Sequence, residues 1–113
     1  MALASYARNL YGPQKAVDIN LVFVKIGASG RVAADSSPET GVTDNADGTY
    51  DVTFPKGVTG FVVGAPAVVG QAGTAAGEVT AFDPTAGTLA LDVGAASLAG
   101  TDTCHLVIAL FNQ

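Results

Sequence analysis

The segment of residues 45–56 constrains the fold most, because a turn signal, a strand and a strand terminator follow one another within it. Asn45-Ala-Asp-Gly48 suits a type I turn in which Gly48 takes a positive φ. The next six residues alternate with a period of two, which predicts a strand with a core face (Tyr50, Val52, Phe54) and a solvated face (Thr49, Asp51, Thr53). Pro55 has no N–H to donate to a sheet, so pairing is expected to end there. The sequence therefore predicts a β-hairpin.

Short strands separated by turn residues recur along the rest of the chain. A second hairpin is expected where residues 78–82 and 88–93 flank Asp83-Pro-Thr-Ala-Gly87, because Pro presets φ at the first corner and Gly87 supplies the left-handed residue. Shorter or weaker strands are expected at residues 31–34, 42–43, 61–63 and 67–69. Strands spaced by about 8–12 residues are typical of an all-β antiparallel β-sandwich or jelly roll. We expect about eight strands.

Two of the expected strands are apolar on both sides. In residues 19–26, one side consists of Ile19, Leu21 and Phe23, and the other of Val22, Val24 and Ile26. In residues 103–111, Cys104, Leu106, Ile108 and Leu110 alternate with Thr103, His105, Val107, Ala109 and Phe111. Strands of this kind lie at the centre of a sheet or in a sheet covered by a second sheet or subunit. We therefore expect both faces of residues 19–26 to be buried.

The composition contains more apolar surface than one domain of 113 residues needs. Hydrophobic residues make up 49% and charged residues 13%, about half of the ~25% charged residues of average soluble proteins. The longest apolar run, residues 58–70, is too short to span a membrane and is interrupted by glycines and Pro66. No membrane association is expected, and the excess apolar surface predicts a homo-oligomer.

Charge and cysteine content exclude further classes. Ten acidic and five basic residues give a net charge of −5, which disfavours nucleic acid because binding to phosphates relies on clustered Lys and Arg. The single cysteine, Cys104, cannot form an internal disulfide and suits a reducing cytoplasm. The N-terminus lacks the charged and long apolar regions of a secretory signal, so the chain is expected to start at its own Met1.

The N-terminal residues have helical rather than strand spacing. Leu3, Tyr6, Ala7 and Leu10 fall on one helical stripe, which Gly12-Pro13 ends. A helix of this length is marginal in water. We expect residues 1–18 to be a short arm, helical or extended, and residues 19–113 to be a β-sandwich domain. The arm either docks on its own domain or becomes ordered against a neighbour.

Residues that could carry catalysis or bind metal are sparse. His105 is the single histidine; no Gly-x-Ser-x-Gly motif accompanies it, and zinc would need three or four ligands. We interpret His105 as a surface or interface residue and Cys104, which alternates with Leu106, as a small core residue. No glycine-rich phosphate-binding motif is present.

The acidic residues also fit structural roles. Asp44, Asp47 and Asp51 lie near the first turn, but the EF-hand spacing fails at Ala46, so turn chemistry explains them better than calcium binding. Further carboxylates at turns or outward strand positions are expected to be solvated: Asp83, Asp92 and Asp102. We therefore expect no catalytic, cofactor-binding or metal-binding residues, no cofactor, and no enzymatic activity.

Four short motifs within residues 19–113 together resemble a known family. They are Gly48-Thr-Tyr50 with Val52 and Phe54 leading into Pro55-Lys56, then Phe61-Val-Val63, Gly87-Thr88-Leu89, and Thr101-Asp-Thr-Cys-His-Leu-Val107. With these motifs the chain resembles the small β-sandwich domains of tailed-phage virion proteins, which occur as capsid decoration (cement) proteins and at the ends of tail fibres. The resemblance implies a homotrimer that binds a larger assembly and has no catalytic residues.

The chain differs from the tail-fibre proteins in one respect that favours a decoration protein. Fibre tips follow a long repetitive shaft, whereas this chain begins with a short apolar arm, so it is more similar to a free-standing decoration protein. We expect a virion structural protein, made in the host cytoplasm, that decorates and stabilises a phage capsid as a homotrimer and contacts the major capsid protein. The predicted capsid or oligomer interface consists of Leu3, Tyr6, Leu10 and Tyr11. The alternative is a receptor- or glycan-binding head of a tail fibre or baseplate, with residues 44–48 and 70–77 as its contacts.

Overall fold

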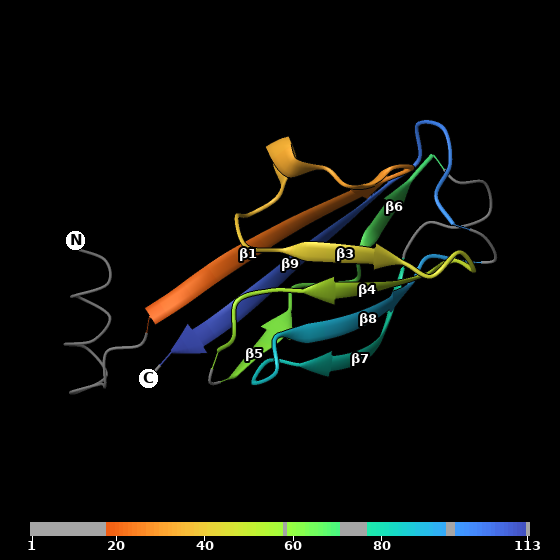
Figure 1. Ribbon diagram of the computed structural model, residues 1–113. Helices are drawn as coiled ribbons and strands as arrows, with labels where there is room; N and C mark the ends of the chain where they lie inside the picture. Colours follow the sequence, from red (N-terminus) through yellow and green to blue (C-terminus); the bar gives the residue numbers. More distant parts are fainter. Residues whose placement is uncertain (1–17, 58, 71–76, 95–96, 113) are drawn as a thin grey trace, which may run out of the picture.

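The computed structural model describes residues 18–57, 59–70, 77–94 and 97–112, which form an antiparallel β-sandwich (Figure 1). The described strands are β1 (Asp18–Gly27), β2 (Gly30–Arg31), β3 (Gly41–Asp44), β4 (Thr49–Thr53), β5 (Thr59–Val62), β6 (Ala67–Val69), β7 (Glu78–Asp83), β8 (Thr88–Asp92) and β9 (Thr103–Asn112). The prediction of an all-β antiparallel sandwich is confirmed, with nine described strands where about eight were expected.

Two sheets form the layers of the sandwich. One has the strand order β2-β1-β9-β5, with β6 also pairing with β9, and the other has the order β3-β4-β8-β7. The longest pairing joins β1 to β9, from Asp18 opposite Asn112 to Ile26 opposite Cys104. On its other side β9 pairs with β5 and β6, so it is the central strand of its sheet. Figure 1 shows the β3-β4-β8-β7 sheet lying across β1 and β9.

The β3–β4 hairpin has the predicted strand and the predicted facing. Tyr50 and Val52 are buried on β4, as is Phe54 just beyond it, whereas the intervening side chains point outward. Gly48 has the expected positive φ of 89°. The predicted type I turn is wrong, because Ala46 also has a positive φ, of 65°. Its N–H donates to Asp44 Oδ1 at 2.8 Å, so a side chain fixes a conformation that alanine alone disfavours.

The β7–β8 hairpin confirms the second predicted turn. Gly87 has a φ of 74°, and its N–H donates to the Asp83 carbonyl at 2.9 Å. The Asp83 carboxylate accepts the Thr85 hydroxyl at 2.8 Å and the Ala86 N–H at 3.1 Å. A Cβ at position 87 would collide with the Phe54 carbonyl. Both φ and close backbone approach therefore require glycine there.

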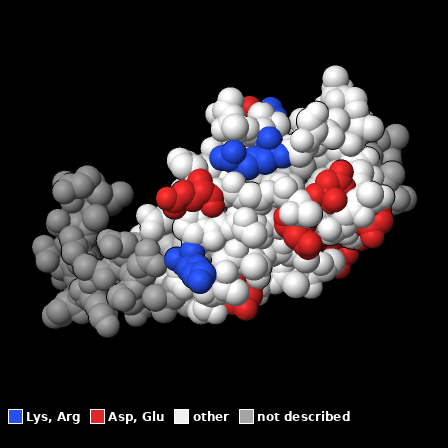
Figure 2. Space-filling view, in the orientation of Figure 1, with Lys and Arg blue, Asp and Glu red and all other residues white. Residues whose placement is uncertain are grey.

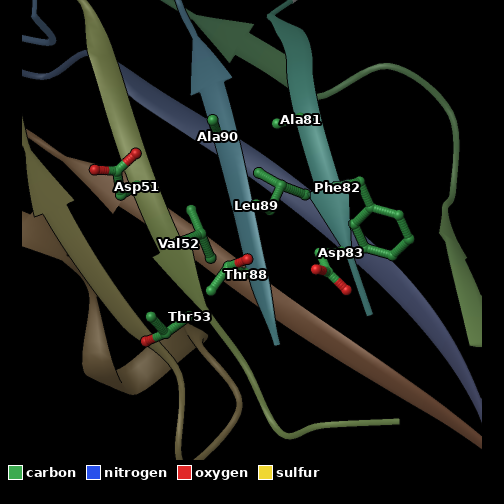
Figure 3. Close-up of a pocket in the computed structure, with 9 residues that line it drawn as sticks. All are labelled: Asp51, Val52, Thr53, Ala81, Phe82, Asp83, Thr88, Leu89 and Ala90. Carbon is green, nitrogen blue, oxygen red and sulfur yellow. The ribbon is translucent and has the colours of Figure 1, made fainter. Parts of the chain in front are cut away.

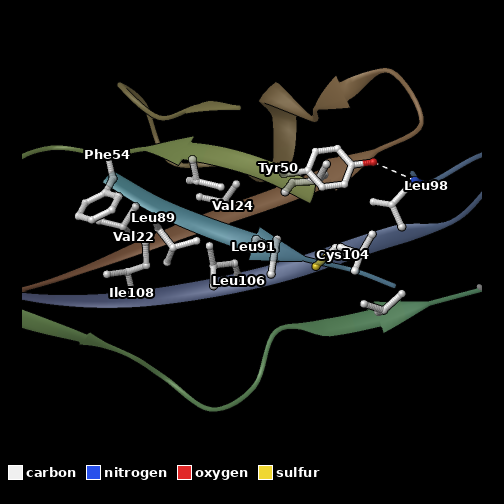
Figure 4. Close-up of a cluster of buried hydrophobic side chains, with 14 of the residues drawn as sticks. Val22, Val24, Tyr50, Phe54, Leu89, Leu91, Leu98, Cys104, Leu106 and Ile108 are labelled. Atoms are coloured by element: carbon white, nitrogen blue, oxygen red, sulfur yellow. Dashed lines mark hydrogen bonds between the residues drawn. The ribbon is translucent and has the colours of Figure 1, made fainter. Parts of the chain in front are cut away.

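The core lies between the two sheets and takes side chains from both (Figure 4). Its buried members are Val22, Val24, Ile26, Tyr50, Val52, Phe54, Val68, Leu89, Leu91, Val93, Leu98, Cys104, Leu106, Ile108 and Leu110. The Tyr50 hydroxyl accepts the Leu98 N–H at 2.8 Å, which satisfies two buried polar groups. The rings of Phe54 and Phe82 stack with centroids 5.7 Å apart.

The weak strand expected at residues 31–34 is not observed. Strand β2 ends at Arg31, and a 3-10 turn, η1 (Ala33–Asp35), follows. Side chains after this turn bind the edge of β1: Ser37 Oγ accepts the Phe23 N–H at 2.8 Å, and Ser36 Oγ accepts the Lys25 N–H at 3.0 Å. Serine hydroxyls thus satisfy backbone groups that a longer strand would otherwise have paired.

The prediction that residues 19–26 are buried on both faces is wrong for the single chain. Val22, Val24 and Ile26 lie in the core, but the opposite side chains are exposed. The reason is that the second sheet covers only one side of β1. On β9, the alternating set Cys104, Leu106, Ile108 and Leu110 is buried, and the prediction that Cys104 is a core residue is confirmed.

Among the described residues, no helix is long and apolar enough to cross a membrane. Strand β1 begins at Asp18, the last residue of the predicted arm. The predicted arm falls almost wholly outside the described residues and stays a prediction.

Candidate functional site

A continuous apolar surface covers the outward side of the β2-β1-β9-β5 sheet. The strand register arranges it in cross-strand rows: Ile19, Phe111 and Thr59; then Leu21, Ala109 and Phe61; then Phe23, Val107 and Val63. We define the apolar face by its large exposed side chains, each 46–59% exposed: Ile19, Leu21, Phe23, Phe61, Val63 and Val69. A contiguous apolar surface of this kind on a single chain marks an interaction site.

In the middle row of the apolar face, a small residue lies between two large ones. The middle strand, β9, carries the small residue Ala109, which is only 3% exposed because Leu21 and Phe61 flank it in the register. The ring of Phe111 packs against that of Phe61, with centroids 5.5 Å apart and planes tilted by 35°. Large side chains of β1 and β5 thus flank the small Ala109 in the middle row, whereas β9 contributes the large Phe111 to the first row.

Polar residues separate the three apolar rows from Val69, which lies opposite Thr103. Lys25 lies opposite His105, and its Nζ is 3.2 Å from Asp35 Oδ2. His105 is exposed, as expected of a surface or interface residue, and its Nε2 is 3.2 Å from the Thr103 hydroxyl. Among the described residues, no Asp or Glu stands in the rows from Ile19 to Lys25.

Cys104 lies on the opposite side of β9, which faces the core. It is fully buried, and this burial raises the pKa of its thiol to about 11. A thiol with such a pKa is almost entirely protonated near neutral pH, and the thiolate is the nucleophilic form. Adjacent residues of β9 therefore separate a buried, inert thiol from an exposed imidazole.

The acidic residues considered for calcium binding take part in turns. The Thr49 hydroxyl and N–H both donate to Asp47, and the hydroxyl bond is the larger cause of the lowered pKa of that carboxyl. Asp44 accepts the Ala46 N–H and, at 3.0 Å, the Ser97 hydroxyl. In the described part of the chain, no group of three or more His, Cys, Asp and Glu could hold a metal ion.

The outward side of the β3-β4-β8-β7 sheet is polar. We define the polar face by Thr43, Thr49, Asp51, Thr53, Glu78, Asp83, Thr88 and Asp92, which the register places in cross-strand rows. Figure 2 shows acidic side chains gathered at the end of this side where β3 turns into β4. Four of the residues that define the polar face are acidic, in contrast to the acid-free rows of the apolar face.

The polar face contains an open trough of about 390 Å³ (Figure 3). Asp51 and Asp83 lie on opposite sides of it, on β4 and β7, with β8 between them. Thr53 and Thr88 also line it, and the rest of the lining is apolar: Val52, Ala81, Phe82, Leu89 and Ala90. The trough thus combines an apolar floor with carboxylates and hydroxyls, which are hydrogen-bonding groups for a polar ligand.

The four residues predicted as an interface, Leu3, Tyr6, Leu10 and Tyr11, lie outside the described residues, as do most of the loop of residues 70–77. The sequence reasoning missed the trough, because each of its threonines and aspartates resembles an ordinary solvated strand residue. It identified Ile19, Leu21 and Phe23 of the apolar face but expected them to be buried.

Comparisons of the chain with protein-family models, curated proteins and solved structures found no match.

Proposed function

We propose that the chain is a non-enzymatic structural protein of a tailed-phage virion, a homotrimer that decorates and stabilises the capsid surface. The observation that supports this most is the apolar face, where six large side chains are about half exposed on one rigid sheet. A surface of this composition costs free energy in water and is stabilised by a protein partner. The resemblance of residues 19–113 to decoration proteins supplies the type of assembly.

In this proposal the N-terminal arm contacts the major capsid protein. Its apolar side chains, Leu3, Tyr6, Leu10 and Tyr11, would each contribute roughly 1.5–3 kcal/mol if buried, before the cost of ordering is subtracted. Three arms on one trimer bind at high effective concentration once the first has bound. A weak contact per arm is therefore sufficient for tight decoration.

Co-sedimentation with purified tailed-phage shells that lack their decoration protein tests the proposal. The full chain should pellet with the shells at a ratio fixed by the lattice and should raise their denaturation temperature. Deleting residues 1–12 should leave the sandwich folded and weaken pelleting at least about tenfold. A full chain that pellets with none of the shells, or a deletion that binds them unchanged, would contradict the respective part of the proposal.

The trough on the polar face favours a second candidate, a receptor- or glycan-binding head of a tail fibre or baseplate. Sugar hydroxyls could donate hydrogen bonds to Asp51 and Asp83, on opposite sides of the trough, and to Thr53 and Thr88. A glycan array distinguishes the two functions. Specific binding that Asp51→Ala abolishes, together with no affinity for shells, would favour the head over the decoration protein.

A further inference from the structure

We infer that the apolar face is a self-association surface: it packs against the apolar face of another copy of this chain. The inference deepens the proposed function and rests on it for the biological role, but its evidence is the arrangement of side chains in the sandwich. Three features of the apolar face favour a second copy of this chain as its binding partner: charge, shape and area.

Charge is the first feature. The chain has a net charge of −5, so copies repel one another unless their acidic residues stay apart. The rows from Ile19 to Lys25 contain no acidic residue, whereas Asp51, Glu78, Asp83 and Asp92 all stand on the polar face. Packing apolar face on apolar face keeps the polar-face carboxylates on the outside of the assembly, a full sandwich thickness from the contact.

Shape is the second feature. In the middle row, Leu21 of β1 and Phe61 of β5 flank the small Ala109 of β9, which is buried, so the row presents large apolar side chains on one side of a sheet. Apolar sheet faces pack on other sheet faces, about 10 Å apart, as the inner side of this same sheet already does. The apolar face of a second copy supplies such a surface.

Area is the third feature. Six side chains that are each about half exposed present on the order of 500 Å² of apolar surface. Two copies packed face to face would together bury on the order of 1,000 Å², the lower limit for a specific interface. The apolar face is thus large enough to hold copies together without help from the rest of the surface.

Sedimentation equilibrium of the full chain, with variants in the middle row of the apolar face, tests the inference. The wild type should sediment as a multiple of 11.2 kDa at tens of micromolar. Leu21→Glu and Leu21→Lys should each weaken association on the order of 100-fold, because both bury a charge in an apolar contact. Thr43→Glu, at an exposed position of the other sheet outside the trough, is the matched control and should associate like the wild type.

Mixing the two Leu21 variants identifies the occupant. If apolar faces contact one another, an equal mixture of Leu21→Glu and Leu21→Lys should associate at least about tenfold more tightly than either variant alone. The reason is that opposite charges then meet across the contact. Circular dichroism and thermal unfolding of each variant confirm that the sandwich is retained. No recovery in the mixture, or association that the Leu21 variants leave unchanged, would overturn the inference.

Other occupants give different results. If the chain's own N-terminal segment covers the face, the wild type is monomeric and deletion of residues 1–17 produces self-association. If the full chain and the chain without residues 1–17 are both monomeric, the apolar face binds a different protein, which also overturns the inference. The mass of the assembly distinguishes a failure of the inference from a failure of the proposed function. A dimer that passes the mixing test supports the contact between apolar faces but contradicts the homotrimer. Loss of shell binding alone contradicts only the decoration role.

Discussion

The two outward faces of this sandwich are built on the same plan and have opposite chemistry. On both sheets, alternate residues point into one shared core, and the intervening residues point away from it. On β4 the outward residues are Thr49, Asp51 and Thr53, whereas on β1 they include Ile19, Leu21 and Phe23. The inward residues of the two strands are similarly apolar. The two faces therefore differ at the outward positions, which the core does not constrain.

The first and largest test asks whether the inward side of β4 carries the stability that its outward side does not. Tyr50→Ala and Phe54→Ala should each destabilise the fold by about 3–5 kcal/mol, because each removes a buried aromatic ring. For Tyr50 the Leu98 N–H also loses its acceptor. Thr53→Ala, on the outward side, should cost under ~1 kcal/mol. Urea unfolding measures all three, and equal costs at Thr53 and Phe54 would contradict the assigned facing.

The second test compares how the two sides of β9 affect the dependence of stability on pH. Burial raises the pKa of Cys104 from 9.0 to about 11, so the unfolded chain loses this proton at lower pH than the folded chain. The stabilisation is fully present below pH 9.0 and is lost as the pH rises through the folded value, by about 2–3 kcal/mol.

Urea unfolding of the wild type and Cys104→Ala at about pH 8 and about pH 10.5 measures this loss. The variant lacks the thiol, so its stability should fall less between the two conditions, whatever its cavity costs at both. His105→Gln, on the outward side of β9, should retain the full wild-type loss. Parallel losses in the wild type and in Cys104→Ala would show that burial of the thiol does not cause the effect.

The sequence predicted the polar side of the molecule better than the apolar side. On β4, alternation of Thr and Asp with Tyr, Val and Phe reveals which residues face water, and the structure agrees. On β1 both sides are equally apolar, so periodicity locates the strand but does not indicate which side the second sheet covers. The positive φ of Ala46 was also missed, because it depends on the Asp44 side chain rather than on glycine. The trough requires side chains from β4, β7 and β8, and alternation within one strand does not show which strands become neighbours.

The third test asks whether the apolar face is covered in the assembled protein. Leu21→Ala should cost about 1 kcal/mol in the dissociated chain, where the side chain is 54% exposed, and about 1–2 kcal/mol more in the assembly. Urea unfolding at a low and a high protein concentration separates the two values. Thr53→Ala, on the polar face, should show the same cost at both concentrations. A concentration-independent cost at Leu21 would mean that association does not bury it.

The smallest effect concerns the carboxylates of the hairpin turns. Hydrogen bonds from the hydroxyls of Thr49 and Thr85, the largest cause in each case, lower the pKa of Asp47 and of Asp83 from the usual 3.8. A depressed folded pKa contributes stability above the unfolded value, and that contribution is lost as the pH falls through the folded value. The acid-induced loss from these groups should therefore occur below about pH 4 and be small, because both side chains are exposed. Thermal unfolding between about pH 5 and about pH 2 should show a shallower decline for Asp47→Asn/Asp83→Asn and for Thr49→Val/Thr85→Val than for the wild type. An unchanged decline in both variants would show that these turn hydrogen bonds do not couple to folding, and the polar face would then differ from the apolar face in solvation alone.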